Sequence, residues 1–407
     1  YDGVKILVAV IGSSSVRVAE GYVGVKAVRV TASTPTSVRW SRMLRLVGTK
    51  YVLVCYTAVA FSPYTDVERL IRALRLLPHA AFVSGATRNE TGHWAVECFQ
   101  ARLELYALML REGYTASALE CMYCDAVGGP FLTTLAQMAA TPLDERLTGS
   151  AVFVDWFLRV RANGGLGAAC PDVLFFTAGG RKALWANRRS WTPLAAKWGV
   201  TDILLPLRHY HHFTCQEAKL SCAVPQDLAA PPCCLAFLGR SLRDVVTVLE
   251  ATGLTVQVAE STVVGGVKGG LQPWQTDAHL AVMGSQGELR LCLDILRRGG
   301  FSADLSEEEE DPTYVLASQD LTLFLHPLTL DLQGDLPTSQ RATPTRMHVA
   351  GAWLPAPPNP GLYARGLAGP GSLQHRPPGE AWPKCSDPAH HSCLDHLPLD
   401  GTWTKLR

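Results

Sequence analysis

The stretch "LQPWQTDAHLAV", residues 271–282, carries the chemistry around which the sequence can be interpreted. If it is extended, residues i and i+2 share a face, so Gln275, Asp277 and His279 point the same way. Phosphoryl transfer needs divalent cations held by hard oxygen ligands, and three carboxylates at such positions would supply them. Only Asp277 is a carboxylate here. The stretch therefore holds one of the three carboxylates that such a metal site would need.

Length and composition describe a globular protein of several domains. The chain has 407 residues, which predicts two or three domains. Its 47% hydrophobic content, 18% charged content and net charge of +1 indicate no nucleic-acid partner and no acidic membrane surface. No apolar run approaches the roughly 20 residues that span a bilayer. Because the chain begins with Tyr1 rather than Met, we expect membrane attachment only through an anchor or signal upstream of it.

Cysteines and a glycosylation sequon point to a secretory compartment. The chain has twelve cysteines, and disulfides persist in oxidising compartments. Asn89-Glu90-Thr91 is an acceptor sequon for N-glycosylation. A three-residue sequon also arises by chance, so an unmodified surface Asn89 is the alternative.

The first half of the chain alternates strand-like and helix-like segments. Helical spacing joins Val67 to Leu77 and Phe153 to Val160, the latter before Gly164. The β-rich runs are residues 4–12, 50–61 and 172–179. This alternation predicts an α/β fold with a mainly parallel sheet.

The second half begins after a segment rich in proline and cysteine. A strand at 202–205 precedes it, and "APPCCL" (230–235) ends it. The pattern then predicts a helix at 238–249, a strand at 254–258, a helix at 289–296 and strands at 313–318 and 321–328. From Gly334 onward proline and glycine dominate, so we expect little regular structure and a partly ordered tail.

Four cysteines lie within twenty residues at this junction: Cys215, Cys222, Cys233 and Cys234. Four thiolates can close a tetrahedral zinc site, and a short loop with little core gains most from such a clip. Two disulfides are the alternative, with each adjacent cysteine finding its own partner. One of His209, His211 and His212 could replace a thiolate ligand, although imidazoles beside such sites more often face solvent. For Cys385 and Cys393, near three histidines, a tail disulfide is favoured over a second metal.

Several motifs together resemble the fukutin-related, LicD-like family of phosphosugar and phosphocholine transferases. They are "PPCCL", a helix ending "VLEATG", "STVVGGVKGGLQPWQTDAHLAV", "RRGGF", "LTLFLHPL" and "AGAWLPAPPNPGLYARGLAGPG". The amino-terminal half, with "CDAVGG" at 124–129, resembles the glycosyltransferase-A-like stem of that family. The resemblance covers nearly the whole chain at low identity.

The resemblance implies a domain plan and a structural zinc ion. A noncatalytic stem would span 1–207, a zinc loop and junction 208–236, a nucleotidyltransferase-like α+β domain 237–383, and a tail 384–407. Zinc would be held by Cys215, Cys222, Cys233 and Cys234. In the stem, Cys55, Tyr56 and Thr57 stand where a working glycosyltransferase would show Asp-x-Asp.

The resemblance also implies that the transferase site has degenerated. The family pattern "PWDxDxDLGI" has become Gln275, Asp277 and His279, and the carboxylate of "HVDLW" aligns with Phe324. The "GG[ST]LLG" turn has become residues 259–264, losing the two glycines that let backbone approach a phosphate. Lys268 keeps a basic residue, which could contact a phosphate or simply face solvent. Glu307–Glu310 are expected to be a solvated loop rather than replacement ligands.

We therefore expect a pseudoenzyme of the secretory pathway that binds a glycan, a nucleotide phosphate or another glycosylation enzyme. A Golgi-lumen protein with a type II anchor is the favoured location, a secreted protein the alternative, and a homo-oligomer is compatible with both. One carboxylate argues against Mg²⁺ or Mn²⁺. The alternative function is an active transferase of ribitol-phosphate or a related group from a CDP-linked donor. Asp277 and His279 would then be catalytic, and Lys268, Ser261, Thr262 and Gln275 would bind substrate. A secreted recognition protein unrelated to glycan assembly is a third class.

Overall fold

The structure is a computed structural model that describes residues 4–11, 23–177, 185–306, 313–318, 321–328, 345–369, 371 and 384–397. The chain divides into two compact units. The first comprises Tyr1–Leu103 and Ala107–Phe213, and the second comprises Glu104–Tyr106 and Thr214–Arg407. The acidic run Glu307–Glu310 lies outside the described residues.

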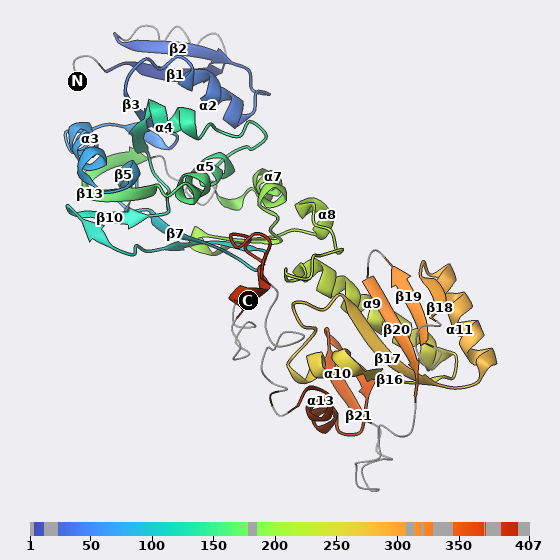
Figure 1. Ribbon diagram of the computed structural model, residues 1–407. Helices are drawn as coiled ribbons and strands as arrows, with labels where there is room; N and C mark the ends of the chain where they lie inside the picture. The colour runs from blue at the N-terminus through green and yellow to red at the C-terminus, as the bar shows by residue number, and fades with distance from the viewer. Residues whose placement is uncertain are drawn as a thin grey trace. The chain divides into compact units, whose positions relative to one another are not determined.

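The first unit is a mixed α/β structure built on several sheets (Figure 1). An eight-stranded sheet has the order β3-β12-β5-β13-β10-β9, with β4 paired to β13 and β6 to β5. A five-stranded sheet has the order β11-β7-β8-β14-β15, and β1 pairs with β2. The strands are β1 (Ile6–Ile11), β2 (Val25–Val30), β3 (Tyr51–Val54), β4 (Ala58–Ala60), β5 (Ala80–Asn89), β6 (Trp94–Ala95), β7 (Cys98–Glu104), β8 (Ala107–Glu112), β9 (Ser117–Ala118), β10 (Cys121–Cys124), β11 (Ala126–Val127), β12 (Phe131–Thr134), β13 (Leu166–Thr177), β14 (Asp202–Leu205) and β15 (His209–His212).

The prediction of a mainly parallel sheet is wrong for this unit. In the described part of the eight-stranded sheet, β5–β13 is the one parallel pairing, and the other six are antiparallel. A parallel pair needs a crossover of a dozen or more residues, whereas β5 and β6, and β9 and β10, are joined by tight turns. The three predicted β-rich runs overlap the strands β1, β3, β4 and β13. The strands of this unit, however, do not alternate strictly with helices.

The helices of the first unit follow the apolar spacing of the sequence. They are α2 (Thr36–Leu44), α3 (Val67–Leu76), α4 (Leu135–Ala140), α5 (Ala151–Ala162) and α7 (Arg188–Trp198). Helix α3 begins after Asp66, whose carboxylate accepts a hydrogen bond from the Arg69 backbone N–H at 2.8 Å. Helix α5 buries Phe153, Trp156 and Phe157. The predicted helices at both places are confirmed.

The second unit contains a five-stranded sheet with the order β16-β17-β20-β19-β18 (Figure 1). Strands β17 and β20 are parallel, and the remaining pairings of this sheet are antiparallel. The elements are α8 (Cys215–Ala218), α9 (Pro232–Ala251), β16 (Thr255–Ala259), α10 (Glu260–Val267), β17 (Asp277–Met283), α11 (Gln286–Arg298), β18 (Ser302–Ser306), β19 (Thr313–Ser318), β20 (Leu321–Pro327), β21 (Thr345–Val349), β22 (Ala352–Ala356), α13 (Pro360–Ala368) and the 3-10 turn η3 (Leu394–His396). The helices and strands predicted between 238 and 328 are confirmed.

One face of this sheet forms the core of the second unit. Apolar side chains of α9 and α11 pack with Ala278 and Leu280 of β17 and with Leu323 and Leu325 of β20. Helix α11 begins at a capping box, in which Ser285 and Glu288 bond each other's backbone N–H groups. Because side chains alternate along a strand, the residues between these apolar ones lie on the opposite face.

The expectation of little regular structure after Gly334 is wrong for residues 345–369. Strands β21 and β22 form an antiparallel hairpin, and α13 follows it. Met347 and Val349 alternate with exposed residues and pack into the core of the second unit. This packing holds the hairpin against the rest of the unit. Pro360 occupies the first turn of α13, where its missing N–H costs no hydrogen bond, and Asn359 caps the helix. Proline here starts a helix rather than breaking one.

The tail segment 384–397 is fastened to the same unit. The Cys385–Cys393 disulfide closes it, as predicted. The backbone N–H of Ala229 donates to the Ser392 carbonyl at 2.7 Å, and that of Leu394 donates to the Asp227 carbonyl at 3.0 Å. Tyr106 and Leu394 pack together in a small apolar cluster, so the tail contributes to the folded unit.

Candidate functional site

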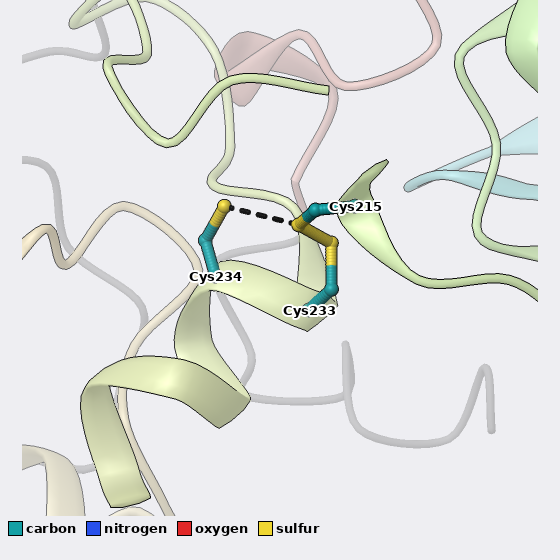
Figure 2. Close-up of side chains that lie close together, drawn as sticks. All are labelled: Cys215, Cys233 and Cys234. Atoms are coloured by element: carbon teal, nitrogen blue, oxygen red, sulfur yellow. Dashed lines mark hydrogen bonds between the residues drawn. A yellow bond between two sulfur atoms is a disulfide. The ribbon is translucent and has the colours of Figure 1, made fainter. Parts of the chain in front are cut away.

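The four junction cysteines form two disulfides, Cys215–Cys233 and Cys222–Cys234. Cys215 begins α8 after the capping residue Thr214, and Cys233 and Cys234 lie in the first turn of α9. Neighbouring positions on a helix point in different directions, so each finds a separate partner. The two bonds still lie close together, with Cys215 Sγ 3.4 Å from Cys234 Sγ (Figure 2).

The zinc prediction for these cysteines is not confirmed. Zinc is bound by thiolates, and a sulfur engaged in a disulfide has no thiolate charge to offer. The structure has instead the disulfide arrangement that the spacing left open. The neighbouring histidines have partners within the first unit: His211 Nε2 lies 2.7 Å from the Trp185 carbonyl, and His212 Nδ1 lies 3.0 Å from Asp202 Oδ1.

The half-buried face of β17 and β20, opposite the core, carries Asp277 and His279 of the quoted stretch. Asp277 opens β17, and His279 follows on the same face. The register places His279 opposite Phe324, whose ring lies nearly parallel to the imidazole with centroids 4.9 Å apart. An aromatic ring therefore fills the position where the resemblance expects a carboxylate.

Gln275 lies before the strand and is 5% exposed. Its Oε1 accepts from the Gln272 backbone N–H at 2.9 Å. Its Nε2 donates to the Asp277 carbonyl at 3.2 Å and to Ser261 Oγ at 3.3 Å. Gln275 and Ser261, both predicted substrate contacts, thus hold the turn that leads into β17.

Thr262 and Lys268 are placed by α10 at different points of the unit. Thr262 is fully buried, and its hydroxyl accepts from the His279 backbone N–H at 2.7 Å. Lys268 caps the other end of α10, with Nζ 5.9 Å from the centroid of the Trp274 ring. An eight-residue helix is about 12 Å long, so Lys268 and Glu260 stand at opposite ends of α10.

Three side chains converge beside Asp277: Glu260, His279 and His326. His279 Nδ1 lies 2.8 Å from His326 Nε2 and 3.1 Å from Glu260 Oε2. His326 Nε2 lies 3.7 Å from Glu260 Oε1. The Asp277 carboxylate is 3.8 Å from the other ring nitrogen of His279. We call Glu260, His279 and His326 the histidine–glutamate cluster.

Sequence analysis missed two members of this cluster. His326 stands two residues after Phe324, so alternation along β20 puts both on the face of His279. Glu260 is the first residue of α10, directly after β16, which pairs with β17. The alternation signal was available for His326. The position of Glu260 depends on how the chain turns from β16 into α10.

The backbone at Glu260 adopts a conformation that favours glycine. Its φ is +44°, in the left-handed region that residues with a Cβ rarely enter. The resemblance places a glycine at this position. The Glu260 backbone N–H donates to the Tyr363 hydroxyl at 3.1 Å, which helps to hold the turn.

The remaining predicted sites lie in the first unit. Asn89 ends β5, and its Oδ1 accepts from the Thr91 hydroxyl at 2.8 Å and from the His93 backbone N–H at 2.9 Å. Its glycosylation stays a prediction. Cys55 and Tyr56 follow β3: burial raises the pKa of the Cys55 thiol to about 12, and the Tyr56 ring stacks on Phe153 at 4.6 Å. This part of the first unit is packed, and Cys55, Tyr56 and Thr57 provide no carboxylate pair.

No family model and no curated protein matches the chain. Among solved structures, a lincosamide antibiotic adenylyltransferase, LnuA, bound to lincomycin, is 12% identical over 29% of this chain and 78% of its own, with a TM-score of 0.23. GalNAc-T7 with UDP, GalNAc and Mn²⁺ is 10% identical over 48% of this chain and 44% of its own, with a TM-score of 0.34. An antigenic nucleotidyltransferase-like protein from Paracoccidioides brasiliensis is 14% identical over 30% of this chain and 60% of its own, with a TM-score of 0.22.

These likenesses are weak, and the coverage of the last two falls below two thirds of their own length. At such TM-scores they carry no argument about activity. They include nucleotidyltransferase and glycosyltransferase structures, and they do not confirm the fukutin-related, LicD-like resemblance. That resemblance remains a hypothesis based on sequence motifs.

Proposed function

We propose that the chain is a pseudoenzyme related to ribitol-phosphate transferases, which binds a glycan, a nucleotide phosphate or another glycosylation enzyme. The proposal rests on the surroundings of Gln275 and Phe324. Gln275 is buried with both amide atoms bonded inside its own turn, and Phe324 packs against His279. Neither can offer an oxygen to Mg²⁺, which prefers several oxygen ligands in octahedral geometry.

Electrostatics extends this argument to the transferring group. In phosphoryl transfer, metal ions and cations offset the charge that spreads over the phosphate oxygens. The face holds the carboxylates of Asp277 and Glu260, while Lys268 lies at the far end of α10. A phosphate entering here would meet negative charge without a pair of magnesium ions to compensate for it.

The location proposed with this function is the lumen of the secretory pathway. Five disulfides join ten of the cysteines, which is consistent with an oxidising compartment. Within the described residues, no helix combines the length and apolar character needed to cross a membrane. We propose a Golgi-lumen protein with an anchor outside this chain, and a secreted protein as the alternative.

The alternative function is an active transferase using a CDP-linked donor, and one observation favours it. Asp277, Glu260 and two histidines lie together at the start of β17, so a rearranged metal site has the side chains it would need. In this alternative Asp277 is a metal ligand, and His279 is a ligand or a general acid/base.

A donor assay separates the two functions. The full chain is incubated with CDP-ribitol, other CDP-alcohols or sugar nucleotides, with Mg²⁺, Mn²⁺ or Zn²⁺, and release of the nucleotide product is measured. We expect no release above that of Asp277→Asn, a variant that keeps the shape of the side chain. Metal-dependent turnover that Asp277→Asn abolishes would establish the transferase instead.

Calorimetry on the same preparations tests the binding role. Titration with CDP-ribitol, CTP and free glycans without metal should give heat for one of these ligand classes. Heat that requires Mg²⁺ and disappears in Asp277→Asn would contradict the proposal.

A further inference from the structure

We propose that Glu260, His279 and His326 bind one borderline transition-metal ion, with zinc as the best-fitting ion, on the face of β17 and β20 opposite the core. This site differs from a magnesium site for phosphoryl transfer in its ligands and in its ion. It does not depend on whether the chain turns over a donor. Its basis is the geometry, the hydrogen bonding and the chemistry of the three side chains.

The separations of the candidate ligand atoms fit one small ion. They are 2.8 Å between His279 Nδ1 and His326 Nε2, 3.1 Å from His279 Nδ1 to Glu260 Oε2, and 3.7 Å from His326 Nε2 to Glu260 Oε1. Zinc bonds of about 2.0–2.2 Å place neighbouring ligands about 3.4 Å apart in a tetrahedron and about 3 Å apart at right angles. The two imidazole planes are within 6° of parallel and the two nitrogens are hydrogen-bonded to each other, so binding one ion requires both rings to rotate.

The second nitrogen of His326, Nδ1, lies 3.3 Å from Thr313 Oγ1, within hydrogen-bond distance. The second nitrogen of His279, Nε2, lies 3.8 Å from Asp277 Oδ1, which is too far for a direct hydrogen bond. Metal-bound histidines typically donate their other N–H to a carboxylate or another oxygen, which fixes the tautomer. His279 Nδ1 and His326 Nε2 face each other at 2.8 Å, so one of them donates a hydrogen bond to the other. A metal ion that binds both nitrogens would displace this proton.

The surroundings favour a bound ion over a solvated pair of histidines. The side chains of His279 and His326 are 14% and 15% exposed, and that of Glu260 is 44% exposed. Phe324 covers the cluster on one side, and Thr262 fixes the backbone of His279. The more exposed carboxylate of Glu260 marks the open side, where water or a ligand could complete the coordination.

The conformation of Glu260 points in the same direction. A residue with a Cβ is held at φ +44° at the turn where its carboxylate reaches both histidines. Strained backbone positions of this kind persist only when surrounding contacts impose them, and they occur often at ligand sites.

The ligand set selects the class of ion. Two imidazoles and one carboxylate suit zinc and neighbouring transition metals, whereas magnesium prefers oxygen ligands and keeps its waters. The open position would let the ion polarise a bound oxygen, or recognise an anionic group of a partner.

Equilibrium binding on the full chain, kept free of reductant, tests this site. Zn²⁺ and Mg²⁺ are titrated separately into the chelator-treated protein, its variants Glu260→Gly and His326→Ala, and the control His348→Ala, whose histidine is exposed on β21. We expect one Zn²⁺ per chain, no Mg²⁺ binding, and at least about 100-fold weaker Zn²⁺ binding in both cluster variants. The control should bind like the original chain.

Thr313→Val provides a second variant that leaves all three ligands in place. We expect about 10- to 100-fold weaker zinc binding, because His326 loses the partner of its second nitrogen. The proposal is overturned if zinc does not bind, if it binds unchanged in Glu260→Gly and His326→Ala while both remain folded, or if thiol alkylation removes it. Cooperative unfolding and an unchanged far-UV circular dichroism spectrum establish that each variant is folded.

Discussion

Two groups of potential metal ligands in the second unit differ in how they arise from the sequence. The four junction cysteines lie within twenty residues of one another, and their proximity is visible in the sequence alone. The histidine–glutamate cluster joins residues from α10, β17 and β20, and the register of two parallel strands brings them together. The first group is the obvious metal site, yet it is occupied by disulfides. The second group is not evident in the sequence, but the fold brings its three ligand atoms within 4.8 Å of one another.

The spacing of residues in the sequence therefore indicates which side chains lie close together. It does not indicate whether cysteines are thiolates or disulfides. Cysteine spacing is compatible with thiolates on zinc and with disulfides, and the redox compartment decides between them. Histidine and glutamate have no such covalent alternative. Their chemistry is settled by position, by the partners of the second ring nitrogens, and by burial. The cysteines should therefore control stability, and the cluster should control metal binding.

Removing one junction disulfide should produce the largest loss of stability. Cys222 and Cys234 enclose a loop with a separation of 12 residues, and such a crosslink stabilises a fold by about 3 kcal/mol, largely by restricting the unfolded chain. We expect Cys222→Ser with Cys234→Ser to lower the free energy of unfolding by about this amount, measured by denaturant titration. Zinc affinity should be unchanged. A variant that keeps its stability but loses zinc would reverse the roles assigned to the two groups.

Thr262→Val should give the next largest effect and should affect both stability and metal binding. The hydroxyl of Thr262 accepts the His279 backbone N–H at 2.7 Å inside the fold, so valine leaves that donor unpaired. A buried unpaired donor costs about 1–3 kcal/mol. Denaturant titration should show this loss, and zinc binding should weaken because His279 shifts. Thr262→Ser retains the hydroxyl as the control; an equal loss of affinity in both variants would contradict the role of this bond.

Glu260→Gly should raise the stability of the chain while it lowers the zinc affinity. Glycine adopts a φ of +44° without strain, so the variant should be more stable than the original chain by about 1 kcal/mol. It should nevertheless lose zinc affinity. Glu260→Gln, which keeps the Cβ and the strain, is the matched control for stability. Destabilisation by Glu260→Gly would mean that the side chain serves the fold rather than a ligand.

The smallest predicted effect concerns pH and the tail segment 384–397, which is bonded to Asp227 within the Cys222–Cys234 loop. Ser386 donates its backbone N–H and its hydroxyl to Asp227 at 2.7 and 2.8 Å, which keeps the pKa of that carboxyl below its usual value. A lowered folded-state pKa contributes stability above the ordinary value of about 3.9, and this contribution disappears as pH falls through the folded pKa.

Hydrogen exchange of residues 384–397, corrected for the intrinsic effect of pH, should therefore show faster opening as the pH falls below about 4. Asp227→Asn should open more readily at neutral pH and should respond less to acid. The same acid response in both proteins would show that another group fastens the tail. We expect zinc to leave the neutral-pH exchange of this segment unchanged.

Much of the fold could be predicted because apolar periodicity is a local property. The repeat from Leu238 to Leu249 became α9, and Val256 and Val258 became part of β16. The prediction of a mainly parallel sheet was wrong because strand pairing depends on connections between distant segments. The hairpin at 345–356 was missed because prolines hid a short alternating pattern of buried residues.

The candidate site could also be predicted only in part. Alternation placed Asp277 and His279 on one face, and they lie there. It could not show that Gln275 turns inward before the strand begins, since that depends on its bonds to Gln272 and Ser261. Alternation along β20 could have placed His326 on the face of Phe324, but its position beside His279 required the register of β17 with β20. The position of Glu260 required the turn into α10. The motif considered without its neighbouring strands therefore could not predict the histidine–glutamate cluster.

The central claim is that the ion-binding side chains of the second unit are nitrogen and oxygen ligands on the sheet, and not the junction cysteines. Cobalt can replace zinc, and its absorption spectrum distinguishes sulfur from nitrogen and oxygen ligands. In the unreduced full chain we expect one bound Co²⁺ with visible d–d bands, no sulfur-to-cobalt charge-transfer band, and loss of the spectrum in His326→Ala. A charge-transfer band from sulfur, or no cobalt spectrum at all, would contradict the claim.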